Sequence, residues 1–264
     1  MKTSVRRENG QRMLQQLAAG HADTDGSSIV PVFPDFWKMH LEHLFGEVWS
    51  RPKLALRERI MVNLTGLIFH KFHFGILNCM RWALNNGIKR EEILELILHV
   101  TYYAGWPCGV NAIEVAKEVL PPLDKKEKLE KDIPEEPEPD PAVYVEKGQR
   151  ILDQLFSQHD PGGRKDNEIR QVFPDFWEMM QGHLFGEIWS RPGLTLRERI
   201  VINLTAQIFH KFNSGIASSM RWAINNGITR EEILEIVMHV AHYGGWPCGV
   251  NAIEVAKQVF AEKD

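Results

Sequence analysis

Residues 33–60 of the chain read FPDFWKMHLEHLFGEVWSRPKLALRERI, and residues 173–200 read FPDFWEMMQGHLFGEIWSRPGLTLRERI. The same offset of 140 holds without a gap from Phe33 to Glu118, where 61 of 86 positions are identical to their counterparts. A match of this length indicates an internal duplication, and its period is too long for a solenoid or propeller repeat. We therefore expect two homologous domains that pack as an internal pseudo-dimer.

The duplication also sets the expected domain boundaries. The first domain covers residues 1–120 and the second covers residues 142–264. Between them, residues 121–141 contain six prolines, eight acidic residues and four lysines. Because such a composition cannot bury apolar surface, we expect this segment to be an extended, solvated linker.

Each repeat is predicted to be helical throughout. Pro34 opens a helix that runs to about Trp49, and apolar residues recur at helical spacing from about Leu56 to Phe72. Gly87 is placed to cap a helix, Thr229 to Glu232 has the form of a capping box, and Pro107 suits the first turn of a last helix. No alternating strand pattern of useful length occurs, so the predicted fold class is all-α.

The composition excludes several classes of protein. The chain has 264 residues, of which 44% are hydrophobic and 25% charged, so global disorder is excluded. Its formal net charge of −4, without a long basic run, argues against nucleic acid or an anionic membrane as a partner. No apolar stretch approaches the roughly 20 residues of a spanning helix, and the first residues lack the pattern of a secretory signal. We expect a soluble, cytoplasmic protein.

The three cysteines are Cys79, Cys108 and Cys248. Their number is odd and no two form a C-x-x-C pair, so we expect free thiols and no intramolecular disulfide. Cys108 and Cys248 lie at the expected N-terminus of the last helix of each repeat, where the helix dipole could lower the pKa of a thiol. A small buried residue packed against a neighbouring helix is the preferred interpretation of both.

A polar stripe crosses the long apolar helix of each repeat. Arg59, Asn63 and His70 fall on one face, and the second copy keeps the same types as Arg199, Asn203 and His210. Polar groups on an apolar face need partners or a wet pocket. One interpretation is a satisfied structural network or a contact between subunits. The other is a pocket wall in which Arg59 and Arg199 hold a substrate carboxylate through the forked guanidinium.

The next helix carries a set of residues suited to acid/base chemistry. Glu95, His99 and Tyr103 are spaced four residues apart, and the set recurs as Glu235, His239 and Tyr243. A carboxylate one turn from an imidazole fixes its tautomer, and a phenol can stabilise a developing oxyanion. Together with Arg59, Tyr103 would then act as an electron sink. The competing interpretation is that each histidine is structural.

Metal binding is not expected. His40, His43, His70, His73 and His99 suggest a cluster, but His40 is replaced by Met180 and His73 by Asn213 in the second copy. No H-E-x-x-H motif or paired Cys and His spacing occurs. We predict that the protein needs no metal and no other cofactor for activity.

Several repeated motifs resemble those of the carboxymuconolactone decarboxylase family. The second copy carries them as GEIWSRPGL at 186–194, Arg199, Ala223 to Gly227, Glu231 to Ile233, and His239 to Pro247, and the first copy has the same string from Gly46 to Pro107. The resemblance covers nearly all of each repeat. It implies compact helical subunits in ring-like oligomers and the cofactor-free decarboxylation of a lactone acid.

The resemblance is incomplete at the positions that matter most for chemistry. The family histidine would fall on Cys79 in the first copy and on Ser219 in the second, and the glutamate four residues before it would fall on Gly75 or Gly215. A sister branch of the family reduces peroxides with a C-x-x-C dithiol. That dithiol would fall on Phe72 and Gly75, so peroxidase activity is disfavoured.

The predicted site combines the polar residues found by helical spacing with those that the resemblance leaves in place, position by position. The predicted catalytic residues are Glu58, Glu198, His99, His239, Tyr103 and Tyr243. The predicted substrate-binding residues are Arg59, Arg199, His70, His210, Cys79, Ser219, Trp106 and Trp246. Phe72, Phe74 and Trp106 favour an aromatic or bulky apolar ligand.

Two classes of function follow. The first is a cofactor-independent lyase of the decarboxylase type, acting on an aromatic-derived or lactone carboxylic acid by acid/base catalysis. The second is a non-catalytic small-molecule-binding or scaffold protein that kept the fold, and isomerisation, cyclisation or lactone hydrolysis in the same pocket is a further alternative. We expect a homo-oligomer in either case, most simply three chains that form a ring of six domains.

Overall fold

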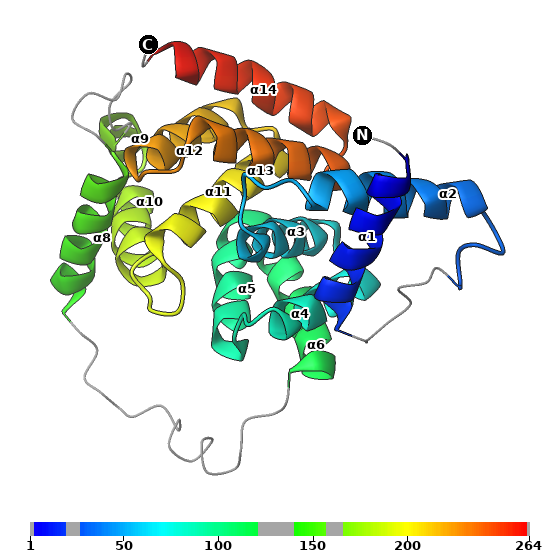
Figure 1. Ribbon diagram of the computed structural model, residues 1–264. Helices are drawn as coiled ribbons and strands as arrows, with labels where there is room; N and C mark the ends of the chain where they lie inside the picture. Colours follow the sequence, from blue (N-terminus) through cyan, green and yellow to red (C-terminus); the bar gives the residue numbers. More distant parts are fainter. Residues whose placement is uncertain (1–2, 20–26, 121–139, 157–165, 263–264) are drawn as a thin grey trace.

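Figure 1 shows a computed structural model of the chain, which describes residues 3–19, 27–120, 140–156 and 166–262. Every regular element among these residues is a helix, so the all-α prediction is confirmed. The first repeat contains α1 (Thr3–Ala18), α2 (Pro34–Met39), η1 (His40–Trp49), α3 (Leu56–His70), α4 (His73–Asn85), α5 (Arg90–Ala104) and α6 (Trp106–Val119). The second contains α8 (Pro141–Leu155), α9 (Asp166–Val172), α10 (Pro174–Met179), η2 (Met180–Ile188), α11 (Leu196–His210), α12 (Asn213–Asn225), α13 (Arg230–Tyr243) and α14 (Trp246–Ala261).

The helix ends follow the local signals in the sequence. Lys71 ends α3 in the left-handed conformation, with φ of 51°, and Gly87 follows α4 with φ of 82°. The capping box at the start of α13 is formed, because the Thr229 hydroxyl accepts from the backbone N–H of Glu232 while the Glu232 side chain accepts from that of Thr229. Pro107 lies in the first turn of α6. These predictions are confirmed.

One predicted helix is not a uniform α-helix. Instead of continuing from Pro34 to Trp49, α2 stops at Met39 and the chain goes on as the wider π-helix η1, and η2 repeats this in the second half. The helix η1 packs directly on the backbone of α1, where a Cβ atom on Gly46 would lie only 2.2 Å from the carbonyl oxygen of Arg6. The repeats therefore share a π-helical segment that ends next to Trp49.

The two repeats form one interlocked body. Helices α3 and α11 are neighbours near the centre of Figure 1, and Phe69 of α3 stacks on Phe209 of α11 with ring centroids 5.3 Å apart. The core of the first repeat includes Ile202 from the second, and the core of the second includes Val62 from the first. The predicted internal pseudo-dimer is therefore confirmed, and its contact surface is part of both hydrophobic cores.

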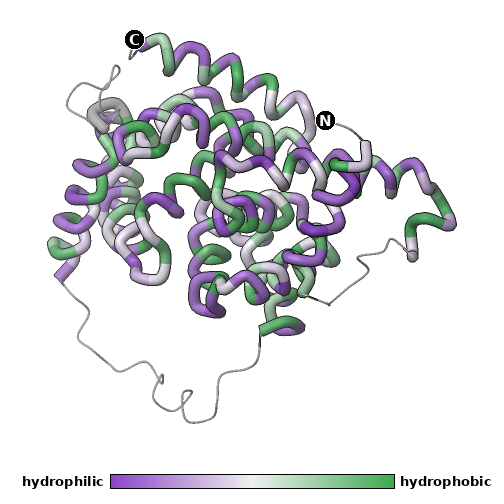
Figure 2. Tube along the Cα trace, viewed as in Figure 1, coloured by the Kyte–Doolittle hydropathy of each residue, from purple (hydrophilic) through white to green (hydrophobic). Residues whose placement is uncertain are grey.

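Hydrophilic and hydrophobic residues are mixed along most helices (Figure 2), whereas α3 and α11 are buried on all sides over most of their length. No helix in the described part of the chain is long and apolar enough to cross a membrane. The predicted linker falls almost wholly outside the described residues, which resume at 140. The expected domain boundaries agree with the end of α6 and the start of α8, and they stay predictions.

Candidate active site

Two polar clusters lie at the contact between the repeats, and each takes side chains from both. The His99 site comprises Glu95, His99 and Tyr103 from α5 and Trp189, Arg191, Arg199, Asn203 and Ser219 from the second repeat. The His239 site comprises Glu235, His239 and Tyr243 from α13 and Trp49, Arg51, Arg59, Asn63 and Cys79 from the first repeat. Each histidine therefore lies beside the arginine of the other repeat.

This crossing corrects the expected grouping of residues. Arg59 was expected to work with Tyr103, which lies on the same repeat. Instead Arg59 donates to Glu235, while Tyr103 accepts a hydrogen bond from Trp189. The two residues belong to different sites because α3 of the first repeat packs against α13 of the second.

Each site contains a buried ion pair between an arginine of one repeat and a glutamate of the other. Arg59 is 1% exposed, and its Nη2 donates to Glu235 Oε2 at 2.8 Å and to the carbonyl oxygen of Arg51 at 2.8 Å. Burial opposes the ionisation of Glu235, but hydrogen bonds from Arg51 and Arg59 outweigh it and lower the pKa of this carboxyl group. In the His99 site, Arg199 bonds Glu95 in the same way at 2.9 Å. Part of each guanidinium is therefore committed to the protein's own carboxylate.

The imidazole of His99 is held in one tautomer. Nη1 of Arg199 lies 3.1 Å from Nδ1 of His99, and because an arginine can only donate, Nδ1 must accept. Neutral His99 therefore carries its proton on Nε2. Burial, helped by the charge of Arg199, lowers the pKa of His99 well below 6.5, so the ring is neutral at physiological pH.

The imidazole of His239 has no such constraint. The ring is fully buried and packs edge-on against Trp49 at 4.7 Å, but neither ring nitrogen has a hydrogen-bond partner among the described residues. Burial, with smaller contributions from Arg59 and His242, lowers the pKa of His239 well below 6.5. His239 is thus a neutral, unengaged imidazole in the interior.

A tyrosine and a tryptophan from opposite repeats meet in each site. Nε1 of Trp189 donates to the hydroxyl of Tyr103 at 2.7 Å, and Nε1 of Trp49 donates to that of Tyr243 at 2.8 Å. Burial raises the pKa of both tyrosines, so each hydroxyl stays protonated. Since the indole uses a lone pair of the oxygen, the phenolic proton remains for another acceptor.

Buried polar atoms without partners mark the His239 site as a place for a polar ligand. Within the described structure, Nε and Nη1 of Arg59, Oδ1 of Asn63 and both ring nitrogens of His239 make no hydrogen bond. In the His99 site the unpartnered atoms are Nε of Arg199 and Nε2 of His99. Native proteins satisfy the great majority of buried polar groups, so these atoms are candidates for hydrogen bonds to water or a ligand. The donors suit an anionic or carbonyl oxygen.

The remaining predicted residues divide into two groups, and the first group joins the repeats. Nε of Arg197 donates to Glu58 at 2.7 Å and Nε of Arg57 donates to Glu198 at 2.7 Å. His70 bonds the carbonyl oxygen of Tyr243 at 2.8 Å, and His210 bonds that of Tyr103 at 2.7 Å. These residues therefore form hydrogen bonds and ion pairs between the two repeats.

The second group lies on the surface. Phe72, Phe74, Trp106 and Trp246 are between 53% and 64% exposed. Trp246 and Trp106 line two matched apolar grooves of about 410 Å³ and 200 Å³, between α13 and α14 and between α5 and α6. The groove of Trp246 is also lined by Arg51 and Glu235 of the His239 site, whereas the lining of the Trp106 groove includes no residue of either polar site.

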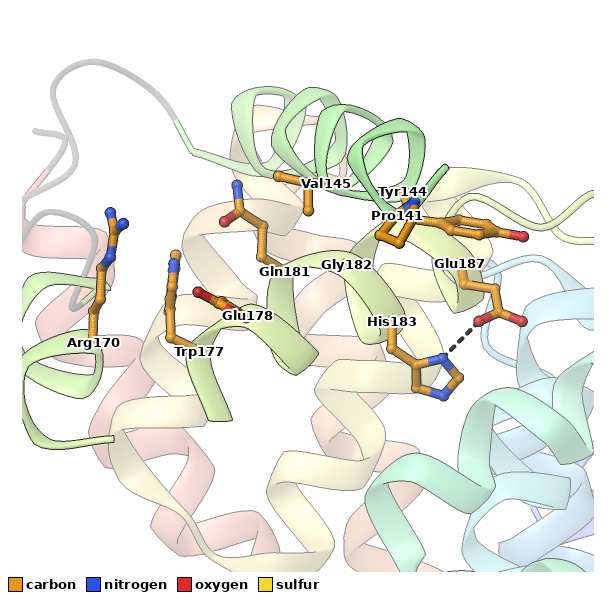
Figure 3. Close-up of a pocket in the computed structure, with 10 residues that line it drawn as sticks. All are labelled: Pro141, Tyr144, Val145, Arg170, Trp177, Glu178, Gln181, Gly182, His183 and Glu187. Carbon is orange, nitrogen blue, oxygen red and sulfur yellow. Dashed lines mark hydrogen bonds and ion pairs between the residues drawn. The ribbon is translucent and has the colours of Figure 1, made fainter. Parts of the chain in front are cut away.

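A larger cavity, of about 570 Å³, lies on the second repeat (Figure 3). Tyr144 and Val145 of α8 form one side, and His183 and Glu187 of η2 lie at the end where the dashed bond is drawn. Its lining includes none of the predicted site residues. Among the described residues, no group of three or more His, Cys, Asp and Glu side chains is arranged to hold a metal ion.

Sequence reasoning missed the residues that complete each site from the other repeat. Trp49, Arg51, Trp189 and Arg191 all lie in the repeated string G-E-(V/I)-W-S-R-P. Their identity in both copies was visible, but only the three-dimensional packing shows that Trp49 reaches Tyr243. The tryptophan and the arginine of each string therefore form hydrogen bonds with site residues of the other repeat.

The comparison with known proteins agrees with this architecture. The model of the carboxymuconolactone decarboxylase family matches residues 34–118 and again residues 174–258. The chain belongs to this family. Its two matched segments contain every helix that contributes to the two polar sites.

Individual relatives resemble one repeat at a time. The chain is 30% identical over 96 residues to 4-carboxymuconolactone decarboxylase of Acinetobacter baylyi, a match that covers 36% of this chain and 69% of the relative. It is 36% identical over 96 residues to nitrosuccinic acid decarboxylase of Metarhizium robertsii, covering 35% and 67%. An uncharacterised 15.0 kDa protein of Paracoccus denitrificans is 29% identical over 82 residues, covering 30% and 61%.

Proposed function

We propose that the protein is a cofactor-independent carbon–carbon lyase that decarboxylates a small carboxylic acid in the sites between its repeats. The observation that carries the proposal is the set of buried, unpartnered donors on Arg59 and His239. Family membership and the names of two relatives, both decarboxylases, support the reaction type. The substrate is proposed to be an acid whose carboxylate is attached to a carbon that also bears, or is conjugated with, a carbonyl, lactone or nitro group.

The proposed reaction needs an electron sink and a proton. The bond between carbon and CO2 breaks, and its electron pair moves into the adjacent carbonyl, lactone or nitro group of the substrate. Nε and Nη1 of Arg59 would stabilise the negative charge that develops on that oxygen. A proton then returns to the carbon from the buried acid, for which the hydroxyl of Tyr243 is available, and solvent restores it.

The two histidines are proposed to orient the substrate. Nε2 of His99 carries a proton and has no partner among the described residues, so it can donate to a substrate oxygen. His239 can donate or accept, because neither of its ring nitrogens is engaged. Both rings are neutral, which suits the binding of an uncharged carbonyl and a proton transfer without a buried cation.

A second candidate function is the binding of a small acid without turnover. The observation that favours it is the chemistry at Cys79 and Ser219, where the family histidine is replaced by a thiol and a hydroxyl. Burial raises the pKa of the Cys79 thiol, so it does not replace the histidine as a base. In this case the unpartnered donors would hold an acid that leaves unchanged.

We also propose that the chain assembles into a ring of three copies. The two apolar grooves are related by the duplication, and each exposes a matched set of large side chains: Trp106, Val110, Ile113, Trp246, Val250 and Ile253. Contiguous exposed apolar surface is unusual on a monomer. A second copy is the fitting occupant because every chain presents the same face twice, which lets a head-to-tail ring close. Light scattering of Trp106→Glu together with Trp246→Glu should give a smaller particle than the parent.

Decarboxylation is tested with 4-carboxymuconolactone and nitrosuccinic acid as probes, by following CO2 release. His99→Gln and His239→Gln should each lower turnover, and the double variant should reduce it to background. His73→Gln is the matched control, because His73 pairs with Glu118 at the surface, away from both sites. Binding of a probe without CO2 release would support the second candidate, whereas full turnover in the double variant would contradict the assignment of the sites.

A further inference from the structure

Two imidazoles meet outside the polar sites, where η1 of the first repeat packs against α13 of the second. Nε2 of His43 lies 3.1 Å from Nε2 of His242, and the ring centroids are 5.2 Å apart. The His43 side chain is 46% exposed, so solvent and ions reach the pair. The two residues are 199 positions apart in the sequence.

The other ring nitrogens determine what the facing Nε2 atoms can do. Nδ1 of His43 lies 2.8 Å from Oε2 of Glu47, and Nδ1 of His242 lies 2.8 Å from the carbonyl oxygen of Met238. A carboxylate and a carbonyl only accept hydrogen bonds, so both Nδ1 atoms carry protons. In the neutral rings both Nε2 atoms are therefore unprotonated, and each directs a lone pair toward the other. Two lone pairs cannot bond each other, and a positive species is needed between them.

This arrangement is that of two metal ligands. Histidines that bind a metal almost always donate their other ring N–H to a carboxylate or a backbone carbonyl, as both do here. With metal–nitrogen bonds of about 2.0–2.1 Å, two nitrogens on one ion lie roughly 2.9 Å apart at a right angle and about 3.4 Å apart at a tetrahedral angle. The observed separation of 3.1 Å falls between these values.

We propose that His43 and His242 bind one divalent transition-metal ion of the Zn²⁺, Ni²⁺ or Cu²⁺ class. Imidazole nitrogen is a preferred ligand for these ions. With two protein ligands, the other coordination positions hold water. Because His43 belongs to the first repeat and His242 to the second, the bound ion clamps η1 to α13 and stabilises the contact between the repeats. The proposal does not depend on the proposed decarboxylase activity.

The duplication supplies a natural control at the matched position. There His183 repeats the bond to its carboxylate, with Nδ1 at 2.6 Å from Oε2 of Glu187 (Figure 3). Its Nε2 faces the hydroxyl of Tyr102 at 2.7 Å, and Tyr102 is the counterpart of His242. A phenol can donate to the lone pair of His183. The matched position is therefore satisfied without an ion.

The test is a calorimetric titration of the full-length protein with ZnCl2, together with the shift in Tm that the ion causes. We expect the parent to bind one Zn²⁺ per chain at this site and to gain Tm. His242→Tyr, which copies the matched position, should lose one equivalent and the Tm gain. Tyr102→His, which copies the His43–His242 pair, should bind one equivalent more than the parent.

Misfolding cannot create the additional Zn²⁺ site that we expect in Tyr102→His. This variant therefore tests the proposal even if His242→Tyr does not fold. Equal stoichiometry in the parent and in a folded His242→Tyr variant would overturn the proposal, since the ions would then be bound by other residues. An unchanged stoichiometry in Tyr102→His would also overturn it. A proton shared between the two rings would appear as the absence of Zn²⁺ binding in the parent.

Discussion

The His99 and His239 sites have matched outer residues but differ in how completely their polar atoms are paired. In the His99 site, Nη1 of Arg199 donates to Nδ1 of His99. In the His239 site, Nη1 of Arg59 and both ring nitrogens of His239 have no partner in the part of the chain that the structure describes. One site is largely closed on itself, whereas the other keeps donors open. A duplicated site can thus diverge in its hydrogen bonds while the residues around it stay the same.

The two sites also differ at the matched positions Cys79 and Ser219, where a sulfur atom replaces an oxygen atom. Ser219 donates to Oδ1 of Asn203 at 2.6 Å, and the amide of Asn203 lowers the pKa of Tyr103 against the larger effect of burial. In the other site, Nδ2 of Asn63 points to the sulfur of Cys79 at 3.5 Å, and Oδ1 of Asn63 is unpartnered among the described residues. Replacing oxygen by sulfur therefore leaves the amide of Asn63 turned toward the thiol. The two sites therefore differ in the hydrogen bonds that they can offer to a ligand.

The largest expected effect comes from the buried arginines. Arg59→Met and Arg199→Met should each cost about 3–5 kcal/mol in the free energy of unfolding, because a buried glutamate loses a partner. Arg199→Met should cost about 1 kcal/mol more, since Nδ1 of His99 then loses its donor too. Urea denaturation measures both. A smaller loss for Arg199→Met than for Arg59→Met would contradict the closed network in the His99 site.

The next effect is a dependence of stability on pH. The pKa of His99 and of His239 is lowered in the folded state, so below about pH 6.5 the unfolded chain takes up protons that the folded chain does not. Their contribution to stability is full above about pH 6.5 and falls as the pH drops, by roughly 1.4 kcal/mol per pH unit for each histidine. His99→Gln and His239→Gln should each reduce the slope by that amount. An unchanged slope in either variant would show that its histidine is protonated in the folded protein.

The smallest effect is expected from exchanging the residues that distinguish the sites. Ser219→Cys should cost about 0.5–1.5 kcal/mol, because it removes a short buried hydrogen bond to Asn203. Cys79→Ser should change stability by less than about 1 kcal/mol, since the new hydroxyl can bond Asn63 as Ser219 bonds Asn203. Thermal unfolding of the two single variants and the double exchange compares them. A large loss in Cys79→Ser would mean that the sulfur is needed for packing.

Much of the fold could be predicted from local signals. The repeat, the helix ends at Gly87 and Pro107 and the capping box at Thr229 depend on residues close together in the sequence, and each is confirmed. The π-helix η1 was not predicted, because its wider turn leaves no mark in the apolar pattern of the sequence.

The site could be predicted only in part, for a physical reason. His99, Tyr103 and Arg199 were found because polar residues at helical spacing on an apolar face must be satisfied. Their grouping was not found, because it depends on which helix of the other repeat lies opposite. The same limit applies to His43 and His242, whose contact arises from packing between the repeats.

Turnover of two double variants tests most directly whether each site is shared between the repeats. Arg59→Lys with His239→Gln alters only the His239 site, although the residues come from different repeats. Arg59→Lys with His99→Gln alters both sites, although the residues come from one repeat. We expect CO2 release from the first variant to continue at the level of the intact His99 site and from the second to fall to background. Turnover retained by the second variant and lost by the first would show that each site belongs to a single repeat.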